Sequence, residues 1–423
     1  MRDAQSAAAG LIADVLAGRS VSESDLASAN AGPAARDLTF GTLRRLGTQR
    51  AIAARLARRG IPDPWVEALL CVALYQLQHT RAAPHAIVDE AVRATRMGGH
   101  SHAAAFINAS LRRFQRESTP LLEAAAKTPE GRWNHPRWWV ERLQRDHGEY
   151  ASHILDSGVG HPPMGLRVNQ RHSTVEDYLA RLRGDGIDAS RLENDALVLD
   201  KPRASRELPG FGSGDVSIQD AGAQWAARIL DAQHGMRVLD ACAGPGGKAA
   251  HLLETADIEL TCLDSAQDRL AAVQGQMTRL GLAASLRCAR AEDLGAWWDG
   301  RPFDRILLDA PCSGSGIVRR HPDAKWLRRA ADIPSFARQQ KTLLSALWQA
   351  LAPGGKLLYV TCSVFAEENV DVVRDWLGKA SDAAELPITA FSGRDGVLLP
   401  SSVHDGFFYA LFVKLPAPAA PAP

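Results

Sequence analysis

The stretch that decides the fold is Val238-Leu239-Asp240-Ala241-Cys242-Ala243-Gly244-Pro245-Gly246-Gly247-Lys248. Its apolar start predicts a buried β-strand, and its glycines predict a tight turn into a following helix. Glycine lets a backbone approach a ligand closely, and the first turn of a helix presents unpaired N–H groups. The stretch is neither GxGxxG nor a Walker loop, because the glycine spacing differs and Ala249 follows Lys248. An ordinary strand-to-helix turn remains an alternative for the glycines taken alone.

Predicted strands and helices alternate regularly on both sides of this stretch, from about residue 218 onward. We expect strands at 236–242, 258–264, 284–289, 304–309, 355–361 and 408–414, and the clearest helices at 266–280, 336–351 and 367–377. This alternation predicts an α/β fold with a mostly parallel, doubly wound sheet.

The chain has 423 residues, which is enough for two or three domains. Apolar residues at helical spacing in residues 1–132 predict an all-α bundle. We expect a small α+β insert at 135–215, the α/β domain at 216–415, and a disordered Pro- and Ala-rich tail at 416–423.

Composition narrows the class of protein. Lys and Arg total 49 against 48 Asp and Glu, so overall charge does not indicate a nucleic-acid partner. Residues 1–132 hold 17 basic and 12 acidic residues, a net of +5, which fits either RNA contact or a solvated helical surface. The chain shows no signal peptide or membrane-spanning run, so we expect a cytoplasmic protein. The six cysteines show neither CxxC nor zinc-type spacing, so we expect no metal site and no disulfide scaffold.

Two acidic residues follow the second and third predicted strands. Asp264 ends the second strand, where a carboxylate commonly holds the ribose of a nucleotide-like ligand, here a nucleoside such as S-adenosylmethionine. Asp293 follows the third strand and is a candidate partner for the adenine amino group. A solvated loop acid or a helix cap explains Asp293 equally well.

Two cysteines follow apolar runs and lie 50 residues apart, in Asp309-Ala310-Pro311-Cys312 and Thr361-Cys362-Ser363. Ligands of open α/β sheets bind at the carboxyl ends of the strands, so both thiols are expected to converge on one crevice. One thiol would then be a nucleophile and the other would serve a second step. Asp309 is placed to hydrogen-bond a base. Taken singly, each cysteine is more often a buried small apolar residue.

A basic segment at 319–329 lies between the two cysteines and contains five Arg or Lys residues with a Trp and a His. This composition suits a phosphate backbone and a stacked base, and we favour RNA contact over a solvated charge run.

These motifs resemble those of the RNA 5-methylcytosine methyltransferases. Cys242–Lys248 is similar to the family's Cys-Ala-Ala-Pro-Gly-Gly-Lys signature, with Gly244 in place of the second alanine. The segments 309–313 and 361–363 match its two cysteine motifs, and 208–211, 217–220 and 405–410 match its entry and closing segments. Residues 1–132 resemble the NusB-type helical domain of a branch that modifies small-subunit ribosomal RNA.

The resemblance implies a Rossmann-like methyltransferase sheet, S-adenosylmethionine as cofactor, and a set of site residues. Cys362 is implied as the nucleophile on carbon 6 of cytosine, Cys312 as the group that helps remove the carbon-5 proton, and Asp309 as the support for the ring. Lys248 is expected to assist near the base, and Gly244 is expected to matter little. DNA cytosine methyltransferases use the Pro-Cys thiol as nucleophile, so these roles rest on the resemblance. The implied cofactor site consists of Cys242, Ala243, Gly244, Pro245, Gly246, Gly247, Lys248, Asp264, Asp293 and Asp309.

The leading hypothesis is an enzyme that makes 5-methylcytosine in 16S ribosomal RNA, acting as a monomer without a metal. The helical domain at 1–132 and the insert at 135–215 are expected to bind RNA. The same chemistry on transfer RNA is one alternative, and a non-catalytic RNA-binding or antitermination factor is another.

Overall fold

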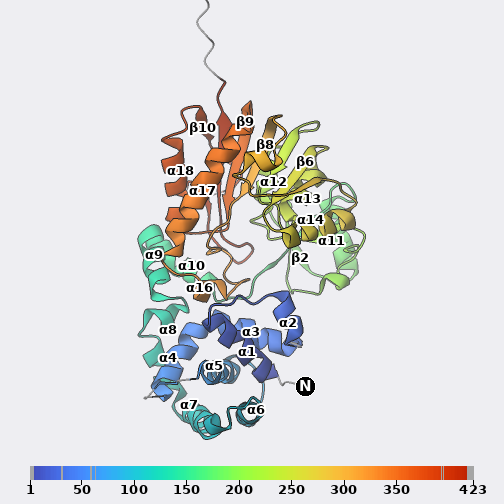
Figure 1. Ribbon diagram of the computed structural model, residues 1–423. Helices are drawn as coiled ribbons and strands as arrows, with labels where there is room; N and C mark the ends of the chain where they lie inside the picture. Colours follow the sequence, from blue (N-terminus) through green and yellow to red (C-terminus); the bar gives the residue numbers. More distant parts are fainter. Residues whose placement is uncertain are drawn as a thin grey trace, which may run out of the picture. The chain divides into compact units, whose positions relative to one another are not determined.

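The computed structural model describes residues 4–29, 32–57, 60–61, 63–391, 393 and 395–416. The chain forms two compact units (Figure 1). The first unit runs to His161 and also takes in Val318–Ala330, while the second covers Pro162–Ile317 and resumes at Ala331. The first unit is therefore built from two separate parts of the chain. Of the expected tail, residues 417–423 lie outside the described residues.

The first unit is a helical bundle around α5 (Pro64–His79). Asp63 caps this helix by accepting from the amides of Trp65 and Val66, and Pro64 supplies a preset first position. Its residues from Ala68 to Gln76 are all buried, because neighbouring helices cover every side of it. The other helices of this unit are α1 (Ala4–Leu16), α2 (Glu23–Ser28), α3 (Pro33–Arg44), α4 (Leu46–Leu56), α6 (Pro84–Met97), α7 (Ala104–Ala125), α8 (Pro129–Trp133), α9 (Arg137–His147), α10 (Ala151–Ser157) and α16 (Ala324–Leu327).

The second unit begins with a small antiparallel sheet. Its strand order is β2-β3-β1-β4, from β2 (Ala189–Arg191), β3 (Leu197–Leu199), β1 (Met164–Val168) and β4 (Val216–Ile218). Helix α11 (Val175–Gly184) packs Val175, Tyr178 and Leu182 into the same apolar cluster as Leu166 and Val168. Every residue of β1 is buried, because β1 lies between β3 and β4 within this sheet.

The large sheet of the second unit has the strand order β10-β12-β9-β8-β5-β6-β7, with β11 paired to β12. Neighbouring strands from β9 to β7 are parallel, whereas β12 runs antiparallel to β9. The order reverses between β5 and β8, which creates the crevice where ligands of such sheets bind. The strands are β5 (Arg237–Asp240), β6 (Glu259–Asp264), β7 (Ser285–Cys288), β8 (Phe303–Asp309), β9 (Leu351–Thr361), β10 (Ala383–Leu386), β11 (Val397–Leu398) and β12 (Phe407–Lys414).

Helices cover both faces of the large sheet (Figure 1). One apolar cluster packs α12 (Trp225–Leu230), α13 (Gly247–Thr255) and α14 (Gln267–Leu280) on alternate strand residues such as Val238 and Leu307. The opposite cluster packs α17 (Asp332–Gln349) and α18 (Val370–Leu377) on Leu239 and Leu308, with α15 (Leu294–Trp297) at its margin. Burial on both faces explains why these strands are continuous apolar runs.

The predicted doubly wound α/β fold behind a helical domain is confirmed. All six expected strands occur as β5, β6, β7, β8, β9 and β12, and β10 and β11 come in addition. The compact units are divided differently from the expected domains. α9 and α10 belong to the helical unit, the β1–β4 sheet belongs to the second unit, and residues 318–330 return to the helical unit.

Candidate active site

The glycine-rich turn joins β5 to α13 at the carboxyl edge of the large sheet. Gly246 has φ +100°, a conformation that L side chains rarely adopt, and an added Cβ there would lie 3.1 Å from Val273 Cα. Gly244 is joined to Pro245 by a cis peptide bond, and its amide donates to Asp264 Oδ2 over 3.1 Å. The turn thus lies directly against the end of β6.

Gly244 is more constrained than expected. A methyl group at this position would lie 2.7 Å from Arg269 Cβ and 2.8 Å from Asp264 Oδ2. Arg269 Nη2 donates to the Gly244 carbonyl over 2.6 Å, so the arginine occupies the space that alanine would need. The expectation that glycine here merely loosens the turn is therefore corrected: the contact with Arg269 requires it.

Buried carboxylates surround this turn. Asp264 is 3 % exposed and accepts from the amides of Gly244 and Ala266. Asp240 is 1 % exposed, and neither of its oxygens makes a hydrogen bond of ordinary geometry with another described residue. S-adenosylmethionine carries positive sulfonium and amino groups, so this acidic, partly unsatisfied set fits that cofactor.

Charge and burial set the protonation of two groups beside the turn. Burial raises the pKa of Asp240 to about 7, nearby Asp309 adds to the rise, and Lys248 and the Cys242 amide offset it only in part. Burial and the neighbouring carboxylates, Asp240 first, also raise the pKa of the Cys242 thiol. Cys242 is therefore a neutral group that lines the turn.

The environment of Asp293 differs from that of these buried acids. It is exposed and occupies the N-cap position of the four-residue helix α15, although its side chain makes no capping hydrogen bond. Its position after β7 agrees with the expected location, and its contact with adenine stays a prediction.

Lys248 and Asp309 form an ion pair at the ends of α13 and β8. Lys248 Nζ lies 2.6 Å from Asp309 Oδ2, and the ammonium lies 5.7 Å from the centre of the Phe407 ring. Burial disfavours the charge on Lys248, but the contact with Asp309 outweighs it and raises the pKa of Lys248. A fixed positive charge and a partly exposed carboxylate thus lie together at this edge of the sheet.

The two thiols expected to converge do so. Cys312 Sγ and Cys362 Sγ are 3.4 Å apart, because β8 and β9 are parallel neighbours and each thiol follows its strand's end. Two backbone bonds join these segments, from Ala310 N to Val360 O (2.9 Å) and from Gly316 N to Cys362 O (2.8 Å). The hydrogen bond with Cys362 and burial raise the pKa of Cys312 well above its usual value. Cys312 is therefore held as a neutral thiol beside its partner.

Two further polar residues were not singled out from the sequence. Glu368 is fully buried and accepts hydrogen bonds from the serines that follow the two cysteines. Arg167 of β1 donates to the Gly247 carbonyl (2.8 Å) and forms a buried pair with Glu254 of α13. Neither residue belongs to a local motif with a chemical signature, because each finds its partners in other segments of the chain.

Two of the five basic residues in the segment 319–329 are buried and do not face solvent. Lys325 is completely buried, and its Nζ donates to the Arg44 carbonyl over 2.9 Å. Trp326 Nε1 donates to the Leu43 carbonyl over 2.8 Å, and Arg319 is 5 % exposed. The expectation of phosphate contact is therefore wrong for Arg319 and Lys325, because both are buried, and Lys325 instead donates to the carboxyl end of α3 within the helical unit.

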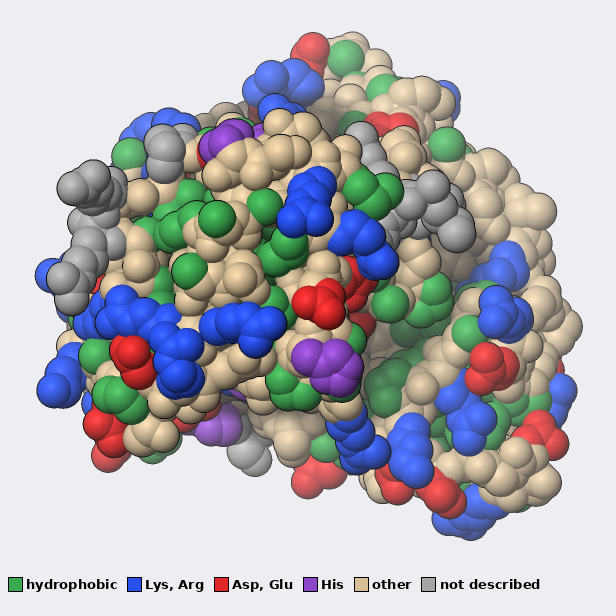
Figure 2. Space-filling view, turned by 90° about the horizontal axis from the view of Figure 1, so that it is seen from below, with side chains coloured by type: hydrophobic (Ala, Val, Ile, Leu, Met, Phe, Trp, Pro, Cys, Tyr) green, Lys and Arg blue, Asp and Glu red, His purple; other side chains and the backbone are tan. Residues whose placement is uncertain are grey.

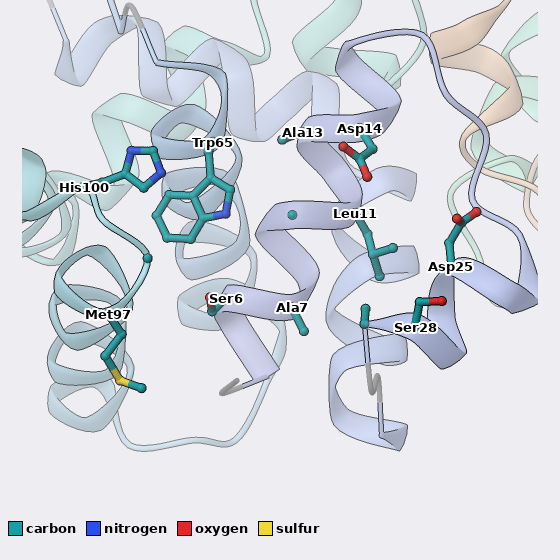
Figure 3. Close-up of a pocket in the computed structure, with 13 residues that line it drawn as sticks. Ser6, Ala7, Leu11, Ala13, Asp14, Asp25, Ser28, Trp65, Met97 and His100 are labelled. Carbon is teal, nitrogen blue, oxygen red and sulfur yellow. The ribbon is translucent and has the colours of Figure 1, made fainter. Parts of the chain in front are cut away.

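A separate cavity of about 710 Å³ lies in the helical unit, among α1, α2 and the region of Trp65 and His100 (Figure 3). Trp65 and His100 stack with ring centroids 4.5 Å apart. Asp14 and Asp25 extend from α1 and α2 on another side of the cavity. It contains none of the residues expected to act on a substrate.

Among the described residues, no cluster of His, Cys, Asp and Glu has the arrangement of a metal site. No helix in the described part of the chain is long and apolar enough to cross a membrane.

Comparison with known families identifies all three regions of the chain. The 16S rRNA methyltransferase RsmB/F family matches residues 227–413, the RsmF/B-like ferredoxin-like domain matches 135–206, and the NusB family matches 2–116. A solved methyltransferase homologue from Pyrococcus horikoshii is 28% identical with a TM-score of 0.61, covering 68% of this chain and 97% of that one. The solved structure of PH0851 shares the fold with a TM-score of 0.79, at 22% identity and over 97% of this chain and 99% of that one.

A curated relative extends the match over nearly the whole chain. Ribosomal RNA small subunit methyltransferase B of Pseudomonas putida is 42% identical over 393 residues, which cover 90% of both proteins. Together with the glycine-rich turn and the paired thiols, this similarity shows that the chain belongs to the ribosomal RNA small subunit methyltransferase B family of S-adenosylmethionine-dependent enzymes.

Proposed function

We propose that this enzyme transfers a methyl group from S-adenosylmethionine to carbon 5 of a cytosine in 16S ribosomal RNA. The observation that carries the proposal is the 3.4 Å separation of the Cys312 and Cys362 sulfurs beside the Lys248–Asp309 pair. Carbon 5 of cytosine becomes nucleophilic only after a group adds to carbon 6, and its proton must later be removed. Two adjacent thiols supply both groups. The RNA is inferred from the name of the curated relatives.

Cys362 begins the reaction as a thiolate that forms a bond to carbon 6 of the cytosine. The electron pair of the 5,6 double bond then makes carbon 5 nucleophilic, and S-adenosylmethionine supplies the methyl group there. Asp309, held by Lys248 at 2.6 Å, hydrogen-bonds the ring nitrogen or amino group where charge builds. The covalent adduct is resolved when the carbon-5 proton leaves and Cys362 is released from carbon 6.

Cys312 is the base for that last proton transfer. The largest cause of its raised pKa is the hydrogen bond with Cys362. Once Cys362 is bonded to carbon 6 it carries no charge, so this cause of the raised pKa is removed, while burial and the charge of Glu368 still raise it. Cys312 acts after losing its proton to solvent. The resulting thiolate takes the carbon-5 proton, and the pair of electrons left behind expels Cys362. The assignment of Cys362 as nucleophile and Cys312 as base rests on the resemblance to the RNA 5-methylcytosine methyltransferases, and the 3.4 Å separation brings the two thiols close enough to share these roles.

The cofactor is proposed to lie on the turn Cys242–Lys248, with Asp264 at its ribose, Asp293 near its adenine and Asp309 beside its reacting end. Support comes from the buried carboxylate of Asp264 and from the unsatisfied carboxylate of Asp240 at the same turn. These groups bind and orient a cationic ligand, and the surrounding apolar clusters exclude water from one side.

RNA contact outside the crevice is proposed for residues 1–132 and 135–215. The net charge of +5 in residues 1–132 supports the first of these surfaces. Figure 2 shows one face of the molecule, on which groups of Lys and Arg lie between acidic and apolar side chains. Such separate basic groups suit contacts to phosphates at intervals along a folded RNA.

The decisive test is methyl transfer from labelled S-adenosylmethionine to unmodified 16S RNA. The wild type should label carbon 5 of one cytosine. Cys362→Ala should be inactive and form no adduct, whereas Cys312→Ala should accumulate a protein–RNA adduct, because methylation occurs but elimination does not. Cys288→Ala, at the exposed cysteine that ends β7, is the matched control and should retain activity.

Other results would change the proposal in defined ways. An adduct trapped by Cys362→Ala in place of Cys312→Ala would reverse the two roles. Labelling of transfer RNA with none on ribosomal RNA would replace the substrate. Absence of any methyl transfer by the wild type, with S-adenosylmethionine binding intact, would reject the activity.

A further inference from the structure

Glu368 lies in a short 3-10 turn (Ala366–Glu368) between β9 and α18, and it is fully buried. Its Oε1 accepts from Ser313 N over 2.7 Å and from Gln340 Nε2 over 3.4 Å. Its Oε2 accepts from Ser313 Oγ over 2.5 Å and from Ser363 Oγ over 2.6 Å. An ionised carboxylate only accepts hydrogen bonds and has about four acceptor sites, so these donors match its capacity.

The two serines bound to Glu368 are the direct neighbours of the two thiols. Ser313 follows Cys312 and Ser363 follows Cys362, so one carboxylate joins both cysteine segments. Gln340 extends the same network, because its Nε2 also donates to the Pro311 carbonyl over 2.9 Å. The backbone on both sides of Cys312 is thereby tied to the segment that carries Cys362.

We propose that Glu368 is a positioning residue that sets the distance between the Cys312 and Cys362 sulfurs for the reaction. This inference rests on the proposed function for its chemical meaning, but the spacing itself is a property of the free protein. Glu368 is completely buried, and its carboxylate acts on the thiols through hydrogen bonds with Ser313, Ser363 and Gln340 and through its charge, which raises the pKa of Cys312.

The chemistry of the network explains why a carboxylate is needed. All four partners are donors, and the two hydroxyls each have a single proton to give. Burial raises the pKa of Glu368, while the hydrogen bonds from Ser313 and Ser363 oppose that rise. A neutral amide would place its own N–H groups against these donors, and at least one serine would have to turn away. The cysteine beside that serine would move with it.

The test compares Glu368→Gln with wild type in the full-length protein, using a probe of thiol spacing that needs no RNA. Phenylarsine oxide binds tightly when one arsenic is held by two thiols at once, so its affinity reports their distance. We expect Glu368→Gln to weaken this binding by about tenfold, because the second thiol no longer meets the arsenic readily. Cys362→Ala gives the affinity of phenylarsine oxide for a protein that can hold the arsenic through Cys312 alone.

Methyl transfer supplies the second readout. A thiol displaced by about 1 Å costs on the order of 100-fold in rate, so kcat should fall by about that factor. The KM for RNA and the dissociation constant for S-adenosylmethionine should stay within about twofold of wild type, because those sites remain folded. Asp375→Asn is the matched control, since it makes the same kind of change at an exposed ion pair on α18 and should alter neither readout.

Smaller changes keep the inference testable if Glu368→Gln fails to fold. Ser313→Ala and Ser363→Ala each remove one hydroxyl that bonds to Oε2 of Glu368, and each should lower arsenical affinity and kcat in the same direction. Unchanged arsenical binding in all of these variants would overturn the role of Glu368. A loss of S-adenosylmethionine binding in parallel with kcat would overturn it too, because it would show a general structural role. Weakened arsenical binding in a protein whose wild type methylates no RNA would uphold the positioning role and reject the proposed function instead.

Discussion

The surroundings of Asp240 disfavour a negative charge on its carboxylate. It is fully buried at the end of β5, and its pKa is raised to about 7, chiefly by burial and then by Asp309. A folded-state pKa above the unfolded value means that the native protein binds a proton more readily than the unfolded chain. Stability from this group is therefore fully present below about pH 4, falls as the pH rises from there, and is lost once the pH passes about 7.

Asp240→Asn should consequently stabilise the free protein at pH 8 and do so clearly less at pH 5. The amide keeps the shape of the side chain and removes the cost of a buried charge, so we expect a Tm higher by roughly 5 °C at pH 8. Thermal unfolding across this pH range measures the effect. S-adenosylmethionine should bind the variant more weakly, because a cationic ligand loses a nearby carboxylate. Equal Tm differences at both pH values would contradict the assignment.

The sequence predicted the location of a site residue correctly where that residue directly follows a predicted strand. Cys312 and Cys362 each end an apolar run, and parallel neighbouring strands place such ends together, as their 3.4 Å separation shows. Glu368 was not predictable in this way. In the sequence Ala366-Glu367-Glu368-Asn369 it resembles any solvated acid before a helix, and only the serines from two distant segments give it a role.

At the scale of elements, an arginine of the small sheet holds the cofactor turn from behind. Arg167 of β1 binds both carboxylate oxygens of Glu254, at 2.8 and 2.7 Å, and its Nη1 donates to the Gly247 carbonyl and to Gln219. The pair is 3% and 2% exposed. The insert, expected to bind RNA or to serve as a linker, therefore also supports α13. Periodicity cannot reveal this, because the contact joins residues 87 positions apart.

Arg167→Met should lower the free energy of unfolding by about 3–5 kcal/mol, because it leaves Glu254 buried without a partner. The double variant Arg167→Met with Glu254→Met should recover most of this loss, since no unpaired charge remains. Urea unfolding of the wild type, Arg167→Met, the double variant and a control variant measures the differences in the free energy of unfolding. Arg171→Met, at the exposed pair with Asp257, is the control and should cost less than about 1 kcal/mol. If Arg167→Met were as mild as this control, the pair would not support α13.

At the scale of the whole molecule, the chain leaves the second unit after the Cys312 segment, enters the helical unit at 318–330, and then returns. There Asp323 accepts from Ser20 Oγ over 2.6 Å, while Lys325 and Trp326 donate to the last carbonyls of α3. Basic composition suggested RNA contact for this segment, and composition cannot distinguish a cation that faces solvent from one that satisfies helix carbonyls. Residues 318–330 therefore fold as part of the helical unit, although they lie between the two cysteine segments in the sequence.

Lys325→Met separates the structural role of this lysine from a role in RNA binding. Burial, with Arg44 and Arg45, lowers the pKa of Lys325 well below its usual value, so the unfolded chain binds more protons and the cost falls as pH rises. The variant should therefore gain more stability relative to wild type at pH 6 than at pH 9, and the gain should vanish only near the ordinary lysine pKa of about 10.4. Its RNA affinity and salt dependence should stay unchanged, whereas loss of a phosphate contact would reduce the log–log salt slope by about 0.7–0.9. Lys127→Met, at an exposed lysine of the same unit, controls for loss of charge in the unfolding measurements. A reduced salt slope in Lys325→Met with no pH-dependent change in stability would show that the segment opens to bind RNA.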